Sequence, residues 1–160
     1  MNINLRHLGL ISFLIPIVTI VVSFIWSANL NLISWCFPNI EGCTSISRVG
    51  RYEPVKYFFK PLMFLYALIL FYFWNSFYNF LKTNNINLSK NFLILAYCSI
   101  IFLILYIIFL GEGKYYKFFR QIGIFIYIFF TVITQLFFSF KLKKLLKINL
   151  IKKNILFFYS

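Results

Sequence analysis

The chain has 160 residues and a formal net charge of +13, with 16 Lys and Arg against 3 acidic residues. Hydrophobic residues make up 62% of it and charged residues only 12%, about half the charged share of a soluble domain. This composition excludes an ordinary soluble protein and fits a single membrane domain, residues 1–160, without a separate globular module. Because the positive charges lie outside the apolar stretches, a surface of anionic lipids suits them better than nucleic acid does.

Four uncharged apolar stretches follow one another along the chain: residues 7–27, 61–81, 92–111 and 122–140. Each supplies about 20 residues, the number that a helix rising 1.5 Å per residue needs to cross about 30 Å of hydrocarbon. We therefore expect an all-α fold, a polytopic membrane protein with four transmembrane helices in an up-down bundle. The first stretch has the positive flank of a signal peptide, but its apolar run exceeds the roughly 7 to 15 residues typical of one, so we expect it to be retained.

Four spans place both termini on the same side of the membrane. Basic residues follow the last span directly, in the tail 141–160, and they favour the cytoplasm for that side. The start of this tail is amphipathic, as in a helix that lies on an anionic leaflet. All three acidic residues then fall on the opposite side, in the first and third loops: Glu41, Glu53 and Glu112. Since loops carry function more often than their scaffold, we expect a recognition surface where these outer loops meet.

The first outer loop, residues 28–60, contains Cys36 and Cys43 with a proline and a glycine between them. On an oxidising face this pair can form a disulfide that fastens the loop. Two unpaired thiols are the alternative. Cys98 is alone in the third apolar stretch and is typical of a small core residue.

Residues 43–54 concentrate hydroxyl groups, two arginines, a glycine and a proline just before the second apolar stretch. The planar guanidinium group offers paired donors that suit phosphate oxygens. We expect this segment, with a nearby lysine and an arginine of the third loop, to bind an anionic lipid headgroup. The expected site comprises Arg48, Arg51, Lys56 and Arg120.

The alternative for the same residues is structural. Arg48 and Arg51 would pair with Glu53 and Glu112 and hold the outer loops together, because charges at an interface are usually paired. The third loop, residues 112–121, also has two tyrosines typical of the headgroup belt and basic residues at helical spacing. Interfacial anchoring accounts for that loop without any ligand.

Catalytic chemistry finds little support in the sequence. His7 is the only histidine and lies on the cytoplasmic side, away from the three carboxylates. A Ser-His-Asp set and the spacing of metal ligands are both missing, so we expect no metal and no cofactor. The apolar stretches contain no ionisable Asp, Glu, Lys or Arg, which argues against a proton-coupled pump.

The first outer loop resembles that of the FRAG/DRAM/SFK superfamily of polytopic membrane proteins. The resemblance rests on Ser45, Ser47, Gly50 and Pro54, followed by Phe59 and Met63. Members of that superfamily usually have more spans than the four expected here. The resemblance implies a helical membrane protein linked to lipid handling or membrane signalling, without a defined catalytic site. Trp35-Cys36 and Cys43 also resemble the outer loop of claudin-like proteins, but the Gly-Leu-Trp of that family is missing.

Three functional hypotheses follow. The first is a non-enzymatic membrane protein that recognises an anionic lipid headgroup at the outer interface or acts in lipid handling, with membrane lipids as its partners. The second is a small accessory subunit that packs its aromatic helices against a larger membrane protein. The third is a membrane-bound lipid-modifying enzyme that would act through Glu53 or Cys36.

Overall fold

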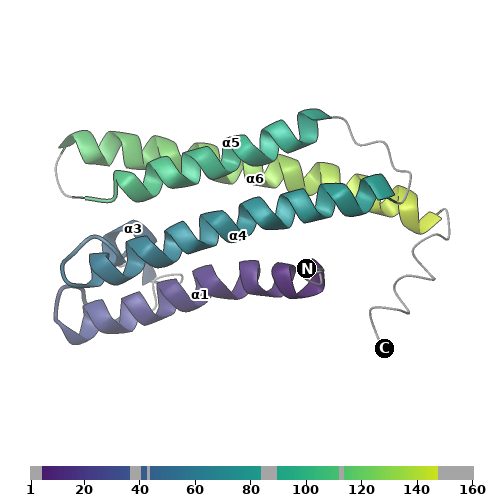
Figure 1. Cartoon of the computed structure of the whole chain (residues 1–160). Coiled ribbons are helices and arrows are strands. Elements are labelled where there is room, and N and C mark those ends of the chain that lie inside the picture. Colours follow the sequence, from purple (N-terminus) through teal and green to yellow (C-terminus); the bar gives the residue numbers. More distant parts are fainter. Residues whose placement is uncertain (1–4, 37–40, 43, 84–89, 112–113, 148–160) are drawn as a thin grey trace.

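A computed structural model of the chain describes residues 5–36, 41–42, 44–83, 90–111 and 114–147, and this part contains helices and no strand. Four long helices lie side by side (Figure 1): α1 (Leu5–Asn29), α4 (Val55–Thr83), α5 (Lys90–Ile108) and α6 (Lys114–Lys147). The short helix α3 (Ile46–Val49) lies between α1 and α4. Consecutive long helices run in opposite directions, so α1 begins and α6 ends at the same end of the bundle (Figure 1). We call the opposite end, where α1 and α5 end and α4 and α6 begin, the α3 end.

Three segments are long and apolar enough to cross a membrane: Leu5–Asn29, Val55–Thr83 and Tyr115–Phe140. The apolar part of α5, Phe92–Ile108, is shorter. At 1.5 Å per residue it measures about 25 Å, a few ångströms less than the hydrocarbon core of a bilayer. The prediction of an all-α chain with several helices able to span a membrane is confirmed, whereas four equivalent spans are not.

The end of α5 corrects the predicted stretch 92–111. Hydropathy continues to Leu110, but the helix ends at Ile108. Leu110 belongs to a tight turn in which its N–H donates to the carbonyl oxygen of Ile107 at 3.3 Å. Its side chain is fully buried. Leu110 is apolar because it packs in the core. A hydropathy window cannot distinguish a core residue in a turn from a residue that continues the helix.

The first loop is shorter than the predicted residues 28–60, because α1 continues to Asn29 and α4 begins at Val55. The end of α1 has the two hydrogen bonds of a Schellman motif, Asn31 N–H to Ala28 O at 3.0 Å and Leu32 N–H to Ser27 O at 3.0 Å. Asn31 takes the left-handed conformation that this motif needs, with φ of 56°. At the other boundary, the predicted loop included lysines that belong to the first turns of α4, since Lys is a good helix former.

Helix α6 is longer at both ends than the predicted span 122–140. It begins at Lys114, so most of the predicted third loop is helical, and it continues through Lys141 to Lys147. The predicted tail 141–160 therefore begins as an extension of α6 and not as a separate helix. Residues 148–160 lie outside the described residues.

The core lies mainly between α4 and α5. Buried side chains recur every three or four residues along one side of α4: Phe59, Met63, Tyr66, Ala67, Leu70, Trp74, Phe77 and Leu81. Two hydrogen bonds join the helices inside the bundle, Tyr66 Oη to Tyr127 Oη at 3.0 Å and Tyr97 Oη to Asn75 Oδ1 at 2.8 Å.

Helix α1 packs against α4 through small polar residues. Thr19, Ser23 and Ser27 recur every four residues on α1, and each is 1% exposed or less. Small side chains let two helix backbones approach closely in a membrane, where burial of apolar surface does not drive helices together. This stripe lets α1 lie close to α4, and Leu5, Ile15 and Ile20 of α1 pack against the core as well.

Candidate anion-binding site at the α3 end

The first loop is fastened to the end of α1. Ser27 of α1 donates a hydrogen bond from Oγ to the carbonyl oxygen of Val49 in α3, over 2.9 Å. Ala28, Ile33 and Val49 form a small buried cluster at the same place. These contacts fix the backbone of the basic segment that was singled out in the sequence.

Gly50 connects α3 to Arg51 and is buried against α4. A Cβ atom at this position would lie 2.6 Å from Cγ of the Phe59 ring, which is closer than real Cβ contacts. Phe59 is itself fully buried. The chain can therefore cross the ring only at a residue without a side chain. This close approach brings the segment that carries Arg51 against α4, just before the helix begins at Val55.

Arg120 comes from the second turn of α6 and is the most deeply buried cation among the described residues, with 6% of its surface exposed. Its Nη1 donates to the carbonyl oxygen of Gly111 at 2.9 Å. A buried charge needs partners, and a guanidinium group has five N–H donors. One described hydrogen bond leaves most of these donors available.

Electrostatic influence links Arg51 and Arg120, two residues of the expected site. Their guanidinium charges lie close enough to act on each other, and both act on the buried hydroxyl group of Tyr106 in α5. The Nε atom of Arg51 is buried, and among the described residues nothing accepts a hydrogen bond from it. Two neighbouring positive charges with an unused buried donor form a suitable position for an anion.

The other two residues of the expected site, Arg48 and Lys56, have different surroundings. The side chain of Arg48 is exposed, and Lys56 forms an ion pair with Glu53, with 3.3 Å from Nζ to Oε1. Tyr57 Oη also donates to Glu53 Oε1, over 3.1 Å. Hydrogen bonds from Tyr57 and Lys56, together with the positive charge of Lys56, hold the pKa of Glu53 below its ordinary value of 4.5.

These contacts bear on the structural alternative, in which Arg48 and Arg51 pair with Glu53 and Glu112. The described side-chain partners of Glu53 are Lys56 and Tyr57, not the two arginines that the alternative paired with it. The other expected acidic partner, Glu112, lies outside the described residues. Of the four expected headgroup residues, Arg51 and Arg120 act on each other through their charges, whereas Arg48 is exposed and Lys56 pairs with Glu53.

Cys36 is disulfide-bonded in the structure, and Cys98 in α5 is a free thiol. Cys43, the expected partner of Cys36, lies outside the described residues, so the Cys36–Cys43 pairing stays a prediction.

Sequence reasoning missed two residues of the α3 end. Tyr106 is one of 11 tyrosines and lies in an apolar stretch, so no local pattern singles it out. Lys60 donates from Nζ to the carbonyl oxygen of Ile108 at 3.2 Å, where α5 ends. Its position directly before the second apolar stretch was a signal, because Lys and Arg interact favourably with the last carbonyl groups of a helix.

The described residues contain no group of three or more His, Cys, Asp and Glu side chains that could hold a metal ion. His7 is exposed near the beginning of α1, at the end of the bundle opposite α3 (Figure 1). It therefore cannot act together with Glu53 in catalysis.

Comparisons of the chain with protein-family models, with curated proteins and with solved structures find no match. The resemblance of the first loop to the FRAG/DRAM/SFK superfamily stays an expectation based on its residues.

Proposed function

We propose that this chain is a non-enzymatic membrane protein that binds the phosphate of an anionic lipid headgroup through Arg51 and Arg120. The observation that carries the proposal is the buried Nε of Arg51, which lacks a described acceptor. The charges of Arg51 and Arg120 also both act on the Tyr106 hydroxyl group. A phosphate group accepts paired N–H donors and carries the charge that would offset the repulsion between them. Arg48 and Lys56 would act at the rim, where exposed charges contribute less.

The proposal includes a topology. All four long helices would cross the bilayer, α5 with a shorter apolar segment, and both termini would lie in the cytoplasm. The α3 end would then lie at the outer interface, at the depth of lipid headgroups. The excess of basic residues after the last apolar stretch supports this orientation.

Single cysteines test the topology in intact cells. Tyr57 and Lys82 are exposed at opposite ends of α4. The proposal expects a membrane-impermeant maleimide to label Tyr57→Cys in intact cells, and Lys82→Cys only after permeabilisation, in a chain with Cys98→Ser. The reverse pattern would place the α3 end in the cytoplasm and contradict the orientation.

Native mass spectrometry tests the headgroup site. The protein, extracted in a mild detergent, is mixed with equal amounts of phosphatidylglycerol and phosphatidylcholine, and the retained lipid is identified by mass. We expect the wild type to retain more phosphatidylglycerol per protein molecule than Arg51→Ala does. Arg48→Ala is the matched control because it removes an exposed charge three residues away. Equal retention by the wild type and Arg51→Ala would contradict the proposal.

Glu112→Gln separates the lipid site from the structural alternative. If phosphate is the partner of Arg51, removing this carboxylate leaves lipid retention unchanged or raises it. If Arg51 instead serves to pair with Glu112, Glu112→Gln lowers the unfolding temperature as much as Arg51→Ala does, and lipid retention depends on neither residue.

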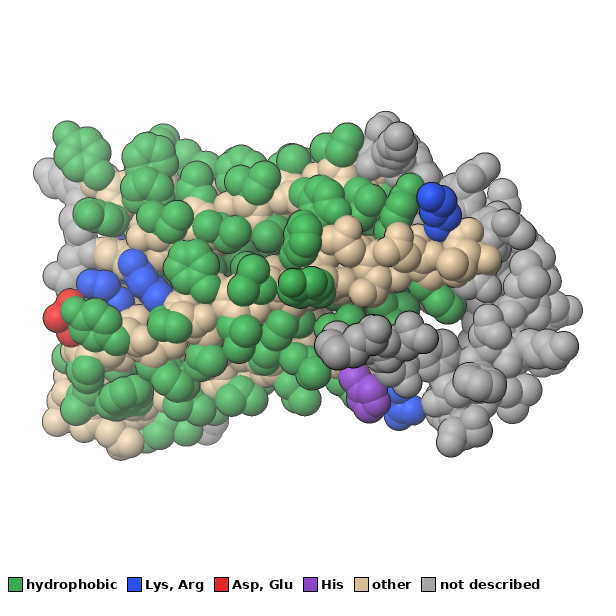
Figure 2. Space-filling model, viewed as in Figure 1, with side chains coloured by type: hydrophobic (Ala, Val, Ile, Leu, Met, Phe, Trp, Pro, Cys, Tyr) green, Lys and Arg blue, Asp and Glu red, His purple; other side chains and the backbone are tan. Residues whose placement is uncertain are grey.

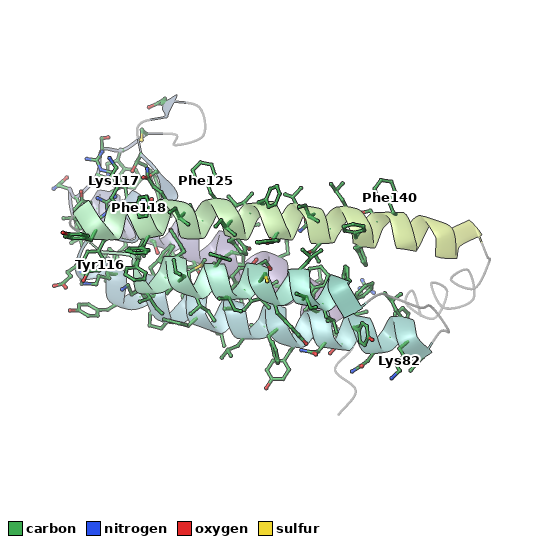
Figure 3. All side chains as sticks on the ribbon, turned by 90° about the horizontal axis from the view of Figure 1, so that it is seen from above. Lys82, Tyr116, Lys117, Phe118, Phe125 and Phe140 are labelled. Carbon is green, nitrogen blue, oxygen red and sulfur yellow. The ribbon has the colours of Figure 1, made fainter. Side chains whose placement is uncertain are left out.

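A small accessory subunit is the second candidate, supported by the outer face of α6. Aromatic side chains on this helix point away from the other helices, among them Phe125 and Phe140 (Figure 3), which are 73% and 68% exposed. In a bilayer such a face contacts either lipid tails or another membrane protein. A protein partner that co-purifies with the wild type and is lost in Phe125→Ala would favour this candidate.

A further inference from the structure

An apolar groove lies between α4 and α5, with a volume of about 220 Å³. All of the side chains that line it are hydrophobic: Phe64, Ala67, Leu68, Phe71, Ile100 and Ile104. Helices α1 and α6 contribute none of them. Tyr66 points elsewhere, because its hydroxyl group bonds to Tyr127 of α6. The groove therefore opens sideways, on a face of the bundle that α1 and α6 leave uncovered.

A lysine stands at the end of this groove that is nearer to α3. Lys60, Phe64 and Leu68 are successive fourth residues of α4, so they lie along one side of the helix. The same spacing aligns Ile100, Ile104 and Ile108 on α5. Lys60 Nζ donates to Ile108 O at 3.2 Å, and this bond connects the two lines of residues just beyond the groove.

The ammonium group of Lys60 can serve a ligand as well as the protein. It has three N–H donors, and the described hydrogen bonds use one of them. The charge of Lys56, one turn earlier, acts on Lys60. Figure 2 shows basic side chains gathered over the beginning of α4 beside an acidic one, with hydrophobic side chains along the rest of this face. A negatively charged group at Lys60 would be drawn to both ammonium groups.

The distance along α4 from Lys60 to the far end of the groove matches the thickness of one leaflet. From Lys60 to Phe71 the helix rises about 16 Å at 1.5 Å per residue. Half of the hydrocarbon core of a bilayer is about 15 Å. The groove residues Phe64 to Phe71 take up about 10 Å of this rise, and Lys60 stands beyond them. A charged group with an apolar groove below it suits the phosphate of a phospholipid and part of one acyl chain.

We infer that the α4–α5 groove holds one acyl chain of an anionic phospholipid whose phosphate accepts a hydrogen bond from Lys60. This is a second lipid position, on the side of α4 that faces away from α6. It does not depend on Arg51 and Arg120, and it adds the chain-binding surface that a headgroup site alone lacks.

Photo-crosslinking in nanodiscs of phosphatidylcholine tests the inference. The probe is phosphatidylglycerol with a diazirine in the middle of one acyl chain, and mass spectrometry locates the labelled peptides. We expect the labels to concentrate on the groove residues of α4 and α5, although the face of α6 around Phe129 is more exposed, with 61% for Phe129 itself. Even labelling of both faces would overturn the inference.

Two tryptophan variants separate the groove from the surrounding surface. Leu68 lines the groove, so Leu68→Trp places a larger side chain in it and should reduce labelling of the groove residues at least fivefold. Leu65→Trp is the matched control, since Leu65 is 45% exposed on α4 and does not line the groove. An equal loss in both variants, or no loss in Leu68→Trp, would contradict a specific chain site.

Lys60 variants test the headgroup contact. Lys60→Gln keeps a donor for Ile108 O but removes the charge, and it should lower labelling by the phosphatidylglycerol probe to that of a phosphatidylcholine probe of the same chain. Lys60→Arg should retain the preference. Arg51→Ala should leave labelling of the groove residues unchanged. The experiment therefore distinguishes failure of the groove inference from failure of the Arg51–Arg120 site. A preference that survives in Lys60→Gln, or is lost in Lys60→Arg, would overturn the role of the charge.

Discussion

Arg120 of α6 donates from Nη1 to the carbonyl oxygen of Gly111 at 2.9 Å, so a buried side chain of α6 closes the turn that follows α5. The bond holds the guanidinium group at one edge, and the charge of this group acts on Arg51 and on the Tyr106 hydroxyl group. Arg120, which was expected to lie in the third loop, belongs to α6 and fastens the turn before it.

Arg120→Lys should weaken both the turn and the lipid site. A lysine keeps the charge but replaces the planar fork with a single point of hydrogen bonding. We expect a loss of about 1.5 to 3 kcal/mol of stability, the range for a hydrogen bond to a charged group, and about tenfold weaker retention of phosphatidylglycerol. Thermal unfolding in detergent and native mass spectrometry measure the two effects. Wild-type values for both would show that Arg120 acts only as a charge.

Gly50→Ala should destabilise the α3 end. The new Cβ atom would meet the Phe59 ring at 2.6 Å, and overpacking of this kind typically costs about 1 to 3 kcal/mol. The unfolding temperature reports the loss. Phe59→Leu provides the control: because the ring is gone, adding Gly50→Ala to that variant should cost clearly less than it does in the wild type. Equal costs in the two backgrounds would show that the ring is not the obstacle.

Tyr66→Phe should loosen the contact between α4 and α6. The variant removes the 3.0 Å hydrogen bond between the Tyr66 and Tyr127 hydroxyl groups while it keeps the ring. Hydrogen bonds between membrane helices are typically worth about 0.6 kcal/mol and at most about 1.7. Tyr72→Phe is the matched control, because Tyr72 is also on α4 but 61% exposed. Equal unfolding temperatures for the two variants would contradict this role of the hydrogen bond.

Glu53→Gln should strengthen attraction of anionic lipid to the α3 end. The carboxylate holds Lys56 at 3.3 Å, and its removal frees that ammonium group. Because exposed ion pairs are weak, we expect at most about a fivefold gain in phosphatidylglycerol retention. A loss of retention in Glu53→Gln would show that the carboxylate supports the lipid site instead of competing with it.

Acid should reproduce the effect of Glu53→Gln in the wild type. The pKa of Glu53 is lowered in the folded chain, so the contribution of its bonds is fully present above the ordinary value of 4.5 and is lost as the pH falls through the lower, folded value. Retention by the wild type should therefore rise toward that of Glu53→Gln below pH 4.5. If both proteins respond to acid by the same factor, another group is responsible.

The helices were predictable from the sequence because apolar length decides membrane insertion and does not depend on packing. The boundaries of the helices were less predictable. Lys56 and Lys60 were assigned to a loop because they are charged, yet they belong to the first turns of α4. Phe109 and Leu110 were assigned to a span because they are apolar, yet they form the turn after α5. Hydropathy measures preference for lipid, and helix ends depend on capping bonds that it does not include.

The candidate site could be predicted in part. Arg51 and Arg120 were expected to act together because their loops meet at one end of the bundle, and in the structure their charges act on each other. Their joint binding of a headgroup stays a prediction. The positions of Arg48 and Lys56 depended on how Gly50 and Glu53 pack locally, which spacing alone does not give. Tyr106 and the α4–α5 groove arise from which helix faces meet, a property of the tertiary structure.

The most direct test of the Arg51–Arg120 site is a double-mutant cycle on phosphatidylglycerol affinity, titrated by native mass spectrometry with Arg51→Ala, Arg120→Gln and the double variant. If one phosphate joins the two guanidinium groups, each single variant should lose about tenfold in affinity and the double variant hardly more, because the pair acts as a unit. Losses that multiply independently, or single variants that bind as the wild type does, would contradict a shared site.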